Sequence, residues 1–328
     1  MLSYMLVFYI VTLLLSLCLL WVAGDLSVRY SIQTASMFKM RTLFVGFVLI
    51  AISTGFPELS VVIASLFENV TPISAGTILG SNVCDISLVL GLPILLSGKL
   101  LIKPEENKDA GPMFFIAALA MALVFLLGSL QRITGLFLIL IYFVSLWGLW
   151  RNRTRKEMIE EEKEQERVVL SDGNSFFKTK TGIIVKLLCS LALVLVASEL
   201  VVRFAIKLTS LLSLSLATVG ATILAVGTSL PELTLSLQAV RKREYDLAIG
   251  NSLGSVLEQG TLLLGILAVS SPTPIKINSL RMIAPFMFLS FAVLGFGLFK
   301  RRRLTRIEGS IMLAIFCSFI VYYIIWIQ

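Results

Sequence analysis

The fold is decided by two matching stretches of sequence, STGFPEL at residues 53–59 and GTSLPEL at residues 227–233. Each stretch places a proline and then a glutamate in the middle of a long apolar run. A proline in a helix removes one amide hydrogen and clashes with the carbonyl group four residues earlier. We therefore predict two long apolar helices, each broken or kinked at its Pro-Glu pair.

The two motifs belong to an internal repeat with a constant spacing of 174 residues, which is the distance from Glu58 to Glu232. At this spacing, residues near 21–93 fall on residues 195–267 without a gap. The other aligned pairs include Asp25 with Glu199, Arg29 with Arg203, Thr54 with Thr228, Pro57 with Pro231, Ser81 with Ser255, Asp85 with Gln259 and Gly91 with Gly265. A repeat of this length indicates two structurally equivalent halves.

The composition is that of a membrane protein. Of the 328 residues, 57% are hydrophobic and 15% are charged, whereas soluble domains carry roughly a quarter charged residues. The mean hydropathy is +0.93. The apolar runs are about 18 to 25 residues long, enough to cross about 30 Å of hydrocarbon as helices. The net charge of +8 comes from basic residues between these runs, so we expect no nucleic-acid partner.

We predict an all-α integral membrane fold with about ten transmembrane helices. The spans lie near residues 4–24, 42–67, 73–98, 111–130, 133–150, 182–205, 212–240, 246–271, 280–299 and 308–327. They divide into a first five-helix repeat at 1–150, a charged linker at 151–181 and a second five-helix repeat at 182–328. Because each half has an odd number of spans, the two repeats are inverted, and helices two and seven are the broken ones.

The basic residues predict the orientation in the membrane. The five odd-numbered connections carry 22 of the 28 Lys and Arg residues, the even-numbered ones carry 5, and Lys186 lies in a span. Cytoplasmic loops are the ones enriched in Lys and Arg. We therefore expect a cell-membrane protein with both termini extracytoplasmic and the 151–181 linker cytoplasmic. The first apolar run, residues 6–23, has no basic leader and is interpreted as a retained helix.

Several kinds of chemistry are disfavoured by the residue types. The chain has no histidine, the commonest zinc ligand and neutral-pH base. Its four cysteines are isolated in apolar runs and lack metal-binding or redox spacing. Two intramembrane carboxylates could serve an intramembrane protease, but such an enzyme pairs aspartates that share a proton. We expect neither enzyme activity nor a cofactor.

Polar side chains recur at equivalent places in the second, third, seventh and eighth spans. A carboxylate in mid-membrane costs about 2.5–3.5 kcal/mol, so two at repeat-related positions indicate a function. Thr54 and Thr228 precede the two glutamates by four residues, about one helical turn. Ser81 and Ser255 precede Asp85 and Gln259 by the same spacing.

These oxygens, with backbone carbonyls freed by the helix breaks, suit hard cations such as Ca²⁺ and Na⁺. The freed carbonyls are expected near Ala51, Ile52, Ala225 and Val226. The spacings Gly76-x-x-x-Gly80 and Gly250-x-x-x-Gly254 are interpreted as close packing of spans three and eight against the broken helices.

STGFPEL with GSNVCD (80–85), and GTSLPEL with GNSLGSVLEQG (250–260), resemble the two alpha repeats of the calcium/cation antiporter superfamily, closest to its prokaryotic sodium/calcium exchangers. The resemblance implies a ten-helix fold, alternating access and ion sites formed by spans two, three, seven and eight. Carried over by position, the ion-site residues are Ala51, Thr54, Glu58, Ser81, Asp85, Ala225, Thr228, Ser229, Glu232, Ser255 and Gln259.

The chain departs from the family pattern at the site. Gly55 stands where the family usually has serine, and Gln259 and Val256 stand where sodium/calcium exchangers commonly carry aspartate and asparagine. Conversely, Asp85 stands where several relatives have asparagine. Three acids remain, which suits exchange of Ca²⁺ for Na⁺. Exchange for H⁺, transport of another cation and a passive cation channel are the alternatives.

Three acids outside this set have open or peripheral roles. Glu258 lies one residue, about 100° of helix, from Gln259, and it either lines an edge of the cavity or faces a polar partner elsewhere. Asp25 with Arg29, and Glu199 with Arg203, are expected to form ion pairs at span ends. Apart from the ions and the lipid bilayer, no obligatory partner is evident.

Overall fold

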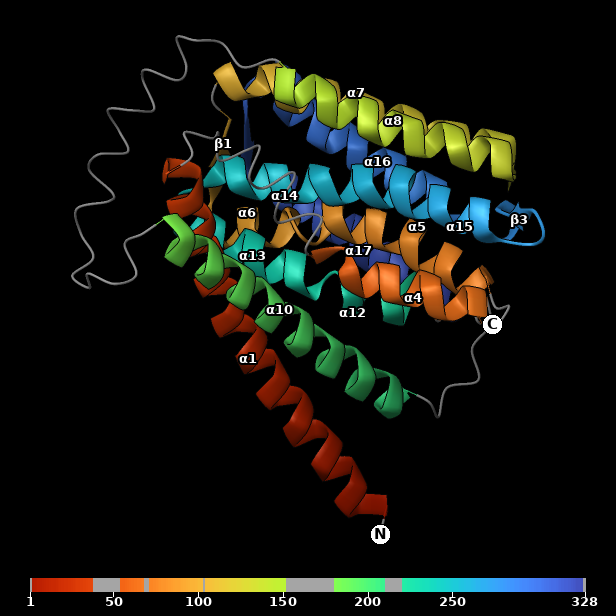
Figure 1. Ribbon diagram of the computed structural model, residues 1–328, viewed down its shortest axis with the longest axis horizontal. Coiled ribbons are helices and arrows are strands. Elements are labelled where there is room, and N and C mark those ends of the chain that lie inside the picture. The colour runs from red at the N-terminus through yellow and green to blue at the C-terminus, as the bar shows by residue number, and fades with distance from the viewer. Residues whose placement is uncertain are drawn as a thin grey trace.

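The computed structural model describes residues 2–37, 54–67, 71–102, 104–151, 180–209 and 220–326. The described chain is a bundle of long helices with short strands at some of their ends (Figure 1). Ala51, with the rest of the first part of the second predicted span, and most of the 151–181 linker lie outside the described residues.

The helices fall where the apolar runs predict them. In the first half they are α1 (Leu2–Met37), α4 (Phe56–Phe67), α5 (Thr71–Ser87), α6 (Gly91–Ser97), α7 (Pro104–Leu127) and α8 (Arg132–Arg151). In the second half they are α10 (Lys180–Thr209), η3 (Gly220–Leu224), α12 (Ala225–Thr228), α13 (Leu230–Arg241), α14 (Tyr245–Leu257), η4 (Glu258–Leu263), α15 (Leu264–Ser270), η5 (Asn278–Leu280), α16 (Ile283–Gly295), η6 (Phe296–Arg301) and α17 (Arg306–Trp326). Within the described ranges, each predicted span overlaps one helix or a consecutive group of helices, and α1 continues beyond the predicted end at residue 24 to Met37.

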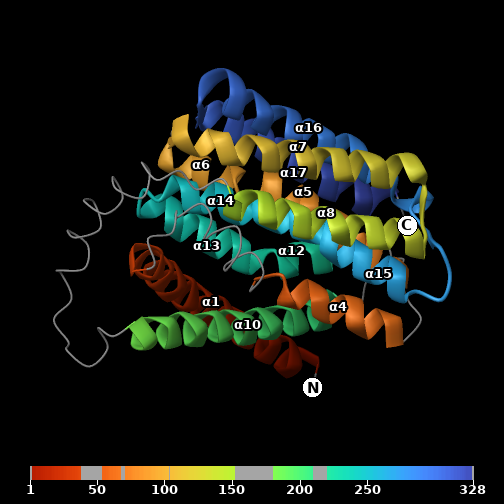
Figure 2. The ribbon, with the colours of Figure 1, turned by 45° about the horizontal axis from the view of Figure 1, so that its top comes forward.

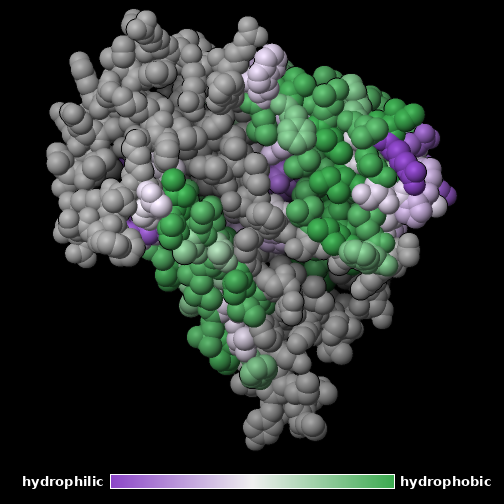
Figure 3. Space-filling model, viewed as in Figure 1, coloured by the Kyte–Doolittle hydropathy of each residue, from purple (hydrophilic) through white to green (hydrophobic). Residues whose placement is uncertain are grey.

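By length and composition, five described helices can cross a membrane, or six if a bent pair counts as one span. Shorter apolar helices lie in the other predicted spans. The spans Thr71–Ser97 and Tyr245–Ser270 lie at the centre of the bundle. In each of them, 83% of an 18-residue apolar segment is buried inside the protein, against 33% in Arg306–Tyr323. Hydrophobic side chains cover much of the described surface in Figure 3, as a face in contact with lipid requires.

Two short antiparallel strand pairs reveal the symmetry. β1 (Lys99–Leu101) pairs with β4 (Arg303–Thr305), and β2 (Ser129–Leu130) pairs with β3 (Ile275–Lys276). The 24-residue helix α7 separates β1 from β2, so the two pairs lie about 36 Å apart, at opposite ends of the bundle (Figure 1). The repeat spacing carries β2 onto β4 and β1 toward β3. The rotation that relates the halves therefore exchanges the two ends, which makes the repeats inverted.

The two halves interlock through close glycine contacts. In the packing of α6 on α17, a Cβ atom on Gly309 would lie 3.0 Å from the carbonyl oxygen of Gly91. The repeat-related pair packs α15 on α8, where a Cβ atom on Gly135 would lie 2.8 Å from the carbonyl oxygen of Gly265. Small residues allow membrane helices to approach this closely. Each contact joins a helix of one half to a helix of the other.

The first helices of the two halves, α1 and α10, lie side by side at one side of the bundle (Figure 2). The Lys242 ammonium group contacts Asp25 Oδ1 at 2.9 Å and donates to the Asp25 carbonyl oxygen at 3.1 Å. The prediction that Asp25 pairs with Arg29 is therefore wrong, because Asp25 pairs with Lys242 at the C-terminal end of α13. The side chains of Glu199 and Arg203 lie outside the described part of the chain.

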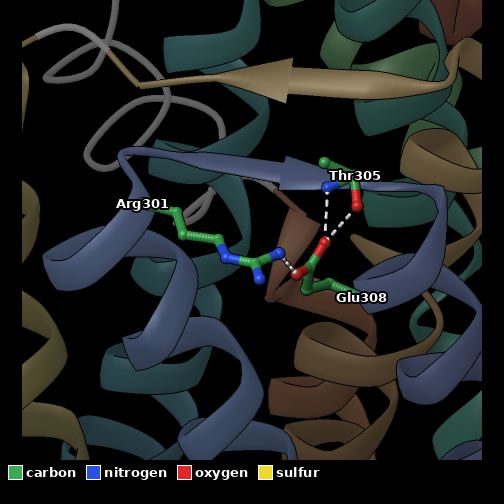
Figure 4. Close-up of polar contacts among 3 residues, drawn as sticks. All are labelled: Arg301, Thr305 and Glu308. Atoms are coloured by element: carbon green, nitrogen blue, oxygen red, sulfur yellow. Dashed lines mark hydrogen bonds and ion pairs between the residues drawn. The ribbon is translucent and has the colours of Figure 1, made fainter.

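A capping box starts α17. The Thr305 amide donates to Glu308 Oε2 at 2.8 Å, and the Thr305 hydroxyl donates to the same oxygen. The Arg301 guanidinium group contacts Glu308 Oε1 at 2.9 Å (Figure 4). The repeat-related residues at the start of α8 use the same arrangement, with the Gln131 amide donating to Thr134 Oγ1 at 2.8 Å. Such caps satisfy amides that the first helical turn leaves unpaired.

Replacement of Glu308 by alanine should destabilise the protein by about 1 kcal/mol, because it leaves the Thr305 amide unpaired and removes the partner of Arg301. Glu308→Gln should lose less, since glutamine also serves in a capping box. Thermal unfolding of the purified protein in detergent measures both. Equal midpoints for the two variants and the wild type would show that the box does not stabilise α17.

Candidate ion-binding site

The seventh span is broken, as its Pro-Glu pair predicts. It consists of the π-helix η3 and the short helix α12, then Ser229, then α13, and the two parts are bent by 44°. Pro231 stands in the first turn of α13, where its missing amide hydrogen breaks no helical bond. The break places Ser229 and Glu232 at the start of a new helix inside the bundle.

The second span has the same arrangement where it is described. Thr54 is helical, Gly55 forms a turn, and α4 begins at Phe56. Glu58 therefore lies in the first turn of α4, as Glu232 lies in the first turn of α13. The amides at a helix N-terminus carry partial positive charge and favour a carboxylate there.

The carbonyl group of Ala225 is not freed by the break as expected. It accepts the Ser229 amide at 3.1 Å, which is an ordinary helical bond. It also accepts the Ser81 hydroxyl at 3.3 Å. The break one turn later leaves this part of the helix intact, so the prediction of a freed carbonyl at Ala225 is wrong. Ala225 nevertheless lies among the predicted site residues.

Helix α5 reaches the broken span through a glycine. A Cβ atom on Gly80 would lie 2.4 Å from the carbonyl oxygen of Ala221 and 2.8 Å from Cβ of Ala225, so only glycine fits there. This contact supports the interpretation of the Gly76-x-x-x-Gly80 spacing as packing. It also brings Ser81, the next residue of α5, to within 3.2 Å of Thr228 Oγ1.

The third and eighth spans meet at a pair of equivalent residues. Gln259 Nε2 donates to Asp85 Oδ2 at 2.8 Å, and these two positions correspond in the repeat. A residue that bonds to its own symmetry mate lies beside the two-fold axis. The axis therefore passes between Asp85 and Gln259, and the predicted site lies on the interface of the halves.

The threonine hydroxyl group of each half faces the glutamate of the other half. Thr228 of the second half faces the carboxyl group of Glu58, and Thr54 of the first half faces that of Glu232. Thr228 donates its hydrogen to the Leu224 carbonyl at 2.9 Å, which is the ordinary behaviour of threonine in a helix. Its oxygen lone pairs are then left for Ser81 or a cation.

The site is fully buried, and most of its oxygens lack donors. None of the predicted residues that the structure describes is more than 1% exposed. Among the described residues, no hydrogen-bond partner reaches the oxygens Glu58 Oε1 and Oε2, Asp85 Oδ1, Ser229 Oγ, Glu232 Oε1 and Oε2, Ser255 Oγ and Gln259 Oε1. Buried acceptors without a partner are costly, and charged ones more so.

The carboxyl groups of Glu58, Asp85 and Glu232 lie close enough to interact electrostatically. Within the described ranges, no three Asp, Glu or Cys side chains converge closely enough to form a metal cluster by themselves. A cation here therefore needs hydroxyl, amide and carbonyl oxygens beside the carboxylates, as hard cations accept.

Sequence reasoning missed two supporting residues on α14. Asn251 Nδ2 donates to the Glu232 carbonyl and to Ser236 Oγ, both at 3.1 Å. The Ser252 hydroxyl donates to the Asp85 carbonyl across the interface of the halves. Both side chains are polar and lie in a helix that is buried over most of its length, and that pattern could have identified them.

A buried set of hard oxygen ligands between two inverted repeats with broken helices defines a membrane ion transporter. The sequence model of the Sodium/calcium exchanger protein family matches residues 8–151 and 182–325. This chain belongs to that family of membrane antiporters.

Curated relatives extend over most of the chain. It is 30% identical over 316 residues to the "Putative antiporter CaxA" of Alkalimonas amylolytica, covering 93% of this chain and 95% of that protein. It is 26% identical over 341 residues to the "Sodium/calcium exchanger MaX1" of Methanosarcina acetivorans, covering 94% and 96%. A solved structure of the sodium-calcium exchanger NCX_Mj matches with a TM-score of 0.78 at 24% identity, covering 96% and 98%, and it has the same fold.

Asp85→Asn should lower calcium transport about tenfold or more, because it removes the buried carboxylate beside the axis. The exchanged double variant, Asp85→Asn with Gln259→Asp, moves the carboxylate to the symmetry-related position and keeps a hydrogen bond between the two residues. We expect it to recover most of the loss. Initial rates of radiolabelled calcium uptake into proteoliposomes compare the three proteins. A double variant no better than Asp85→Asn would rule out equivalent roles for the two positions.

Proposed function

We propose that this chain exchanges Ca²⁺ for Na⁺ across the cell membrane by alternating access. The observation that carries the proposal is the set of buried oxygens at the interface of the halves that have no hydrogen-bond donor among the described residues. A cation would stabilise these oxygens, and its departure would leave them costly unless other cations replaced it. This requirement for replacement is the physical basis of exchange. The ions are cargo, and the proposal includes neither a resident cofactor nor a chemical reaction.

The symmetry of the fold supports alternating access. The rotation that relates the halves exchanges the β1–β4 end of the bundle with the β2–β3 end. If the two halves take up different conformations, exchanging those conformations opens the site toward the opposite end. Two inverted halves can therefore supply inward-open and outward-open states of nearly equal energy.

The choice of ions follows from the ligands and from the relatives. Oxygen ligands suit both Ca²⁺ and Na⁺, and the acids Glu58, Asp85 and Glu232 can be neutralised by one divalent ion or by several monovalent ions in turn. The relative MaX1 is named a sodium/calcium exchanger. Proton coupling is the second candidate, because Gln259 gives the second half an uncharged residue where the first half has Asp85.

The orientation is also a proposal. The third and ninth connections meet at the β1–β4 end, and the fourth and eighth meet at the β2–β3 end, which agrees with the alternation of basic charge. The end that carries Arg301, Arg302 and Arg303 would face the cytoplasm, where basic loops are retained. Both termini would then be extracytoplasmic, and the linker at 151–181 would be cytoplasmic.

Proteoliposomes loaded with Na⁺ should accumulate radiolabelled calcium from a Na⁺-free medium, whereas K⁺-loaded vesicles at equal pH should not. Glu58→Gln and Glu232→Gln should each abolish this uptake and still insert, because neutralisation makes insertion easier while it removes a ligand. Glu308→Gln makes the same chemical change outside the site and serves as the matched control.

The alternatives give different results in the same vesicles. Uptake that ignores Na⁺ and follows an imposed pH difference would assign the counter-ion to H⁺. Uptake that needs no opposing gradient would indicate a channel. Wild-type exchange by both glutamine variants would contradict the site itself.

Labelling of introduced cysteines tests the orientation in intact cells. With the native cysteines replaced, a membrane-impermeant reagent added outside should modify cysteines near residues 1 and 328 and should spare one near residue 165. Permeabilisation should expose the protected site and provides the control. The opposite pattern would invert the orientation and leave the fold unchanged.

A further inference from the structure

The acid Glu258, which the site described above does not use, occupies the space left by a glycine. A Cβ atom on Gly55 would lie 2.7 Å from Glu258 Oε1, 3.0 Å from its Cδ and 3.1 Å from its Oε2. The carboxyl group of Glu258 therefore lies directly against the backbone of the turn between Thr54 and Glu58. The absence of a side chain at residue 55 makes room for it.

The second half has a different residue at the position equivalent to Gly55. The repeat spacing carries Gly55 onto Ser229 and Cys84 onto Glu258. In the second half, the Ser229 hydroxyl faces the carboxyl group of Asp85. In the first half there is no hydroxyl, and the longer, charged side chain of Glu258 reaches the corresponding turn from the opposite span. One neutral oxygen is thus replaced by a carboxylate.

Glu258 stands at the start of a π-helical turn. α14 ends at Leu257, and the π-helix η4 begins at Glu258. The equivalent position in the first half also starts a wide turn, because the Val89 amide donates to the Cys84 carbonyl five residues back, at 2.9 Å. π-turns are rare and frequently lie at functional sites. Both halves therefore have a wide turn at this position. The residue there is Cys84 in the first half and the acid Glu258 in the second.

Among the described residues, no cationic side chain pairs with Glu258. It is 4% exposed, and Glu258 Oε2 has no hydrogen-bond partner among the described residues. The two ion pairs found in the described ranges join other residues. The carboxyl group of Glu258 also lies close enough to Glu58 and Asp85 to interact electrostatically with both. A buried carboxylate beside two others is strongly unfavourable unless a cation accompanies it.

We propose that Glu258 is a fourth carboxylate ligand of the ion site and creates an additional position for a monovalent cation, Na⁺, beside Glu58 and the Gly55 turn. This inference rests on the proposed exchange function and extends it. In this proposal the added position holds Na⁺ only in the sodium-loaded state, and one Ca²⁺ replaces the whole set of Na⁺ ions, so the sodium-loaded state exchanges one Na⁺ more than a site without Glu258. The sodium-to-calcium ratio of exchange rises accordingly.

The ratio is measured from the calcium gradient that a sodium gradient sustains. In proteoliposomes with a tenfold Na⁺ gradient and the membrane voltage held at zero, each coupled Na⁺ raises the equilibrium calcium gradient about tenfold. Glu258→Gln should remain an exchanger but sustain a calcium gradient about tenfold smaller than the wild type. The same variant, purified, should bind one Na⁺ fewer in equilibrium dialysis against labelled Na⁺.

Gly55→Ala tests the contact between Gly55 and the Glu258 carboxyl group without changing any charged residue. Its Cβ atom would displace the Glu258 carboxyl group, so we expect weaker Na⁺ binding and a smaller sustained gradient. Gly148→Ala is the matched control, because a Cβ atom there meets nothing within 4 Å. Gly148→Ala should bind Na⁺ as the wild type does.

The outcomes separate this inference from the function on which it rests. An active Glu258→Gln protein with an unchanged calcium gradient and unchanged Na⁺ binding would overturn the fourth ligand and leave exchange intact. If Glu258→Gln fails to fold, Gly55→Ala decides, and wild-type Na⁺ binding by Gly55→Ala would overturn the inference. Loss of sodium-driven uptake in the wild type itself would instead contradict the proposed function.

Discussion

The burial of carboxylate oxygens without donors is the constraint on which the rest of the structure depends. Glu58 and Glu232 are fully buried, and neither has a hydrogen-bond partner among the described residues. The hydrophobic bundle cannot offset four such oxygens by packing, and cations are the natural compensation. The broken spans serve this purpose, since they place each glutamate in the first turn of a helix whose N-terminal amides favour negative charge.

The inverted repeat determines how those oxygens are shared. Each glutamate faces a threonine of the other half, and Asp85 bonds to its own symmetry mate, Gln259. Neither half therefore contains a complete site. The glycine contacts of α6 with α17 and of α15 with α8 hold the halves in this relation. In the proposed exchange, a relative movement of the halves would alter both the access to the site and the distances between its oxygens, and it would thereby link ion release to the conformational change.

Most of the fold could be predicted from the sequence, and so could the set of polar residues that meet between the halves, because each pattern occurs twice in the chain. The repeat spacing with its odd number of spans predicted inverted halves, and the Pro-Glu pair predicted the break in the seventh span, and the structure agrees. Contacts between distant segments were less accessible. The pairing of Asp25 with Lys242 and the hydroxyl of Ser252 on the Asp85 carbonyl depend on how helices pack, which no local pattern specifies. The contact of the Glu258 carboxyl group with Gly55 could not be predicted either, since a one-residue offset on a π-turn follows no regular helical periodicity.

Competition between the two ions for one site tests the central claim most directly. Equilibrium binding of radiolabelled calcium to the purified protein would be titrated with Na⁺ at constant pH and ionic strength. The proposed exchange predicts complete and competitive displacement with a dependence on Na⁺ steeper than first order, because several monovalent ions would replace one divalent ion on the same carboxylates. Calcium that stays bound at saturating Na⁺, or that binds unchanged to both Glu58→Gln and Glu232→Gln, would contradict a shared site between the two halves.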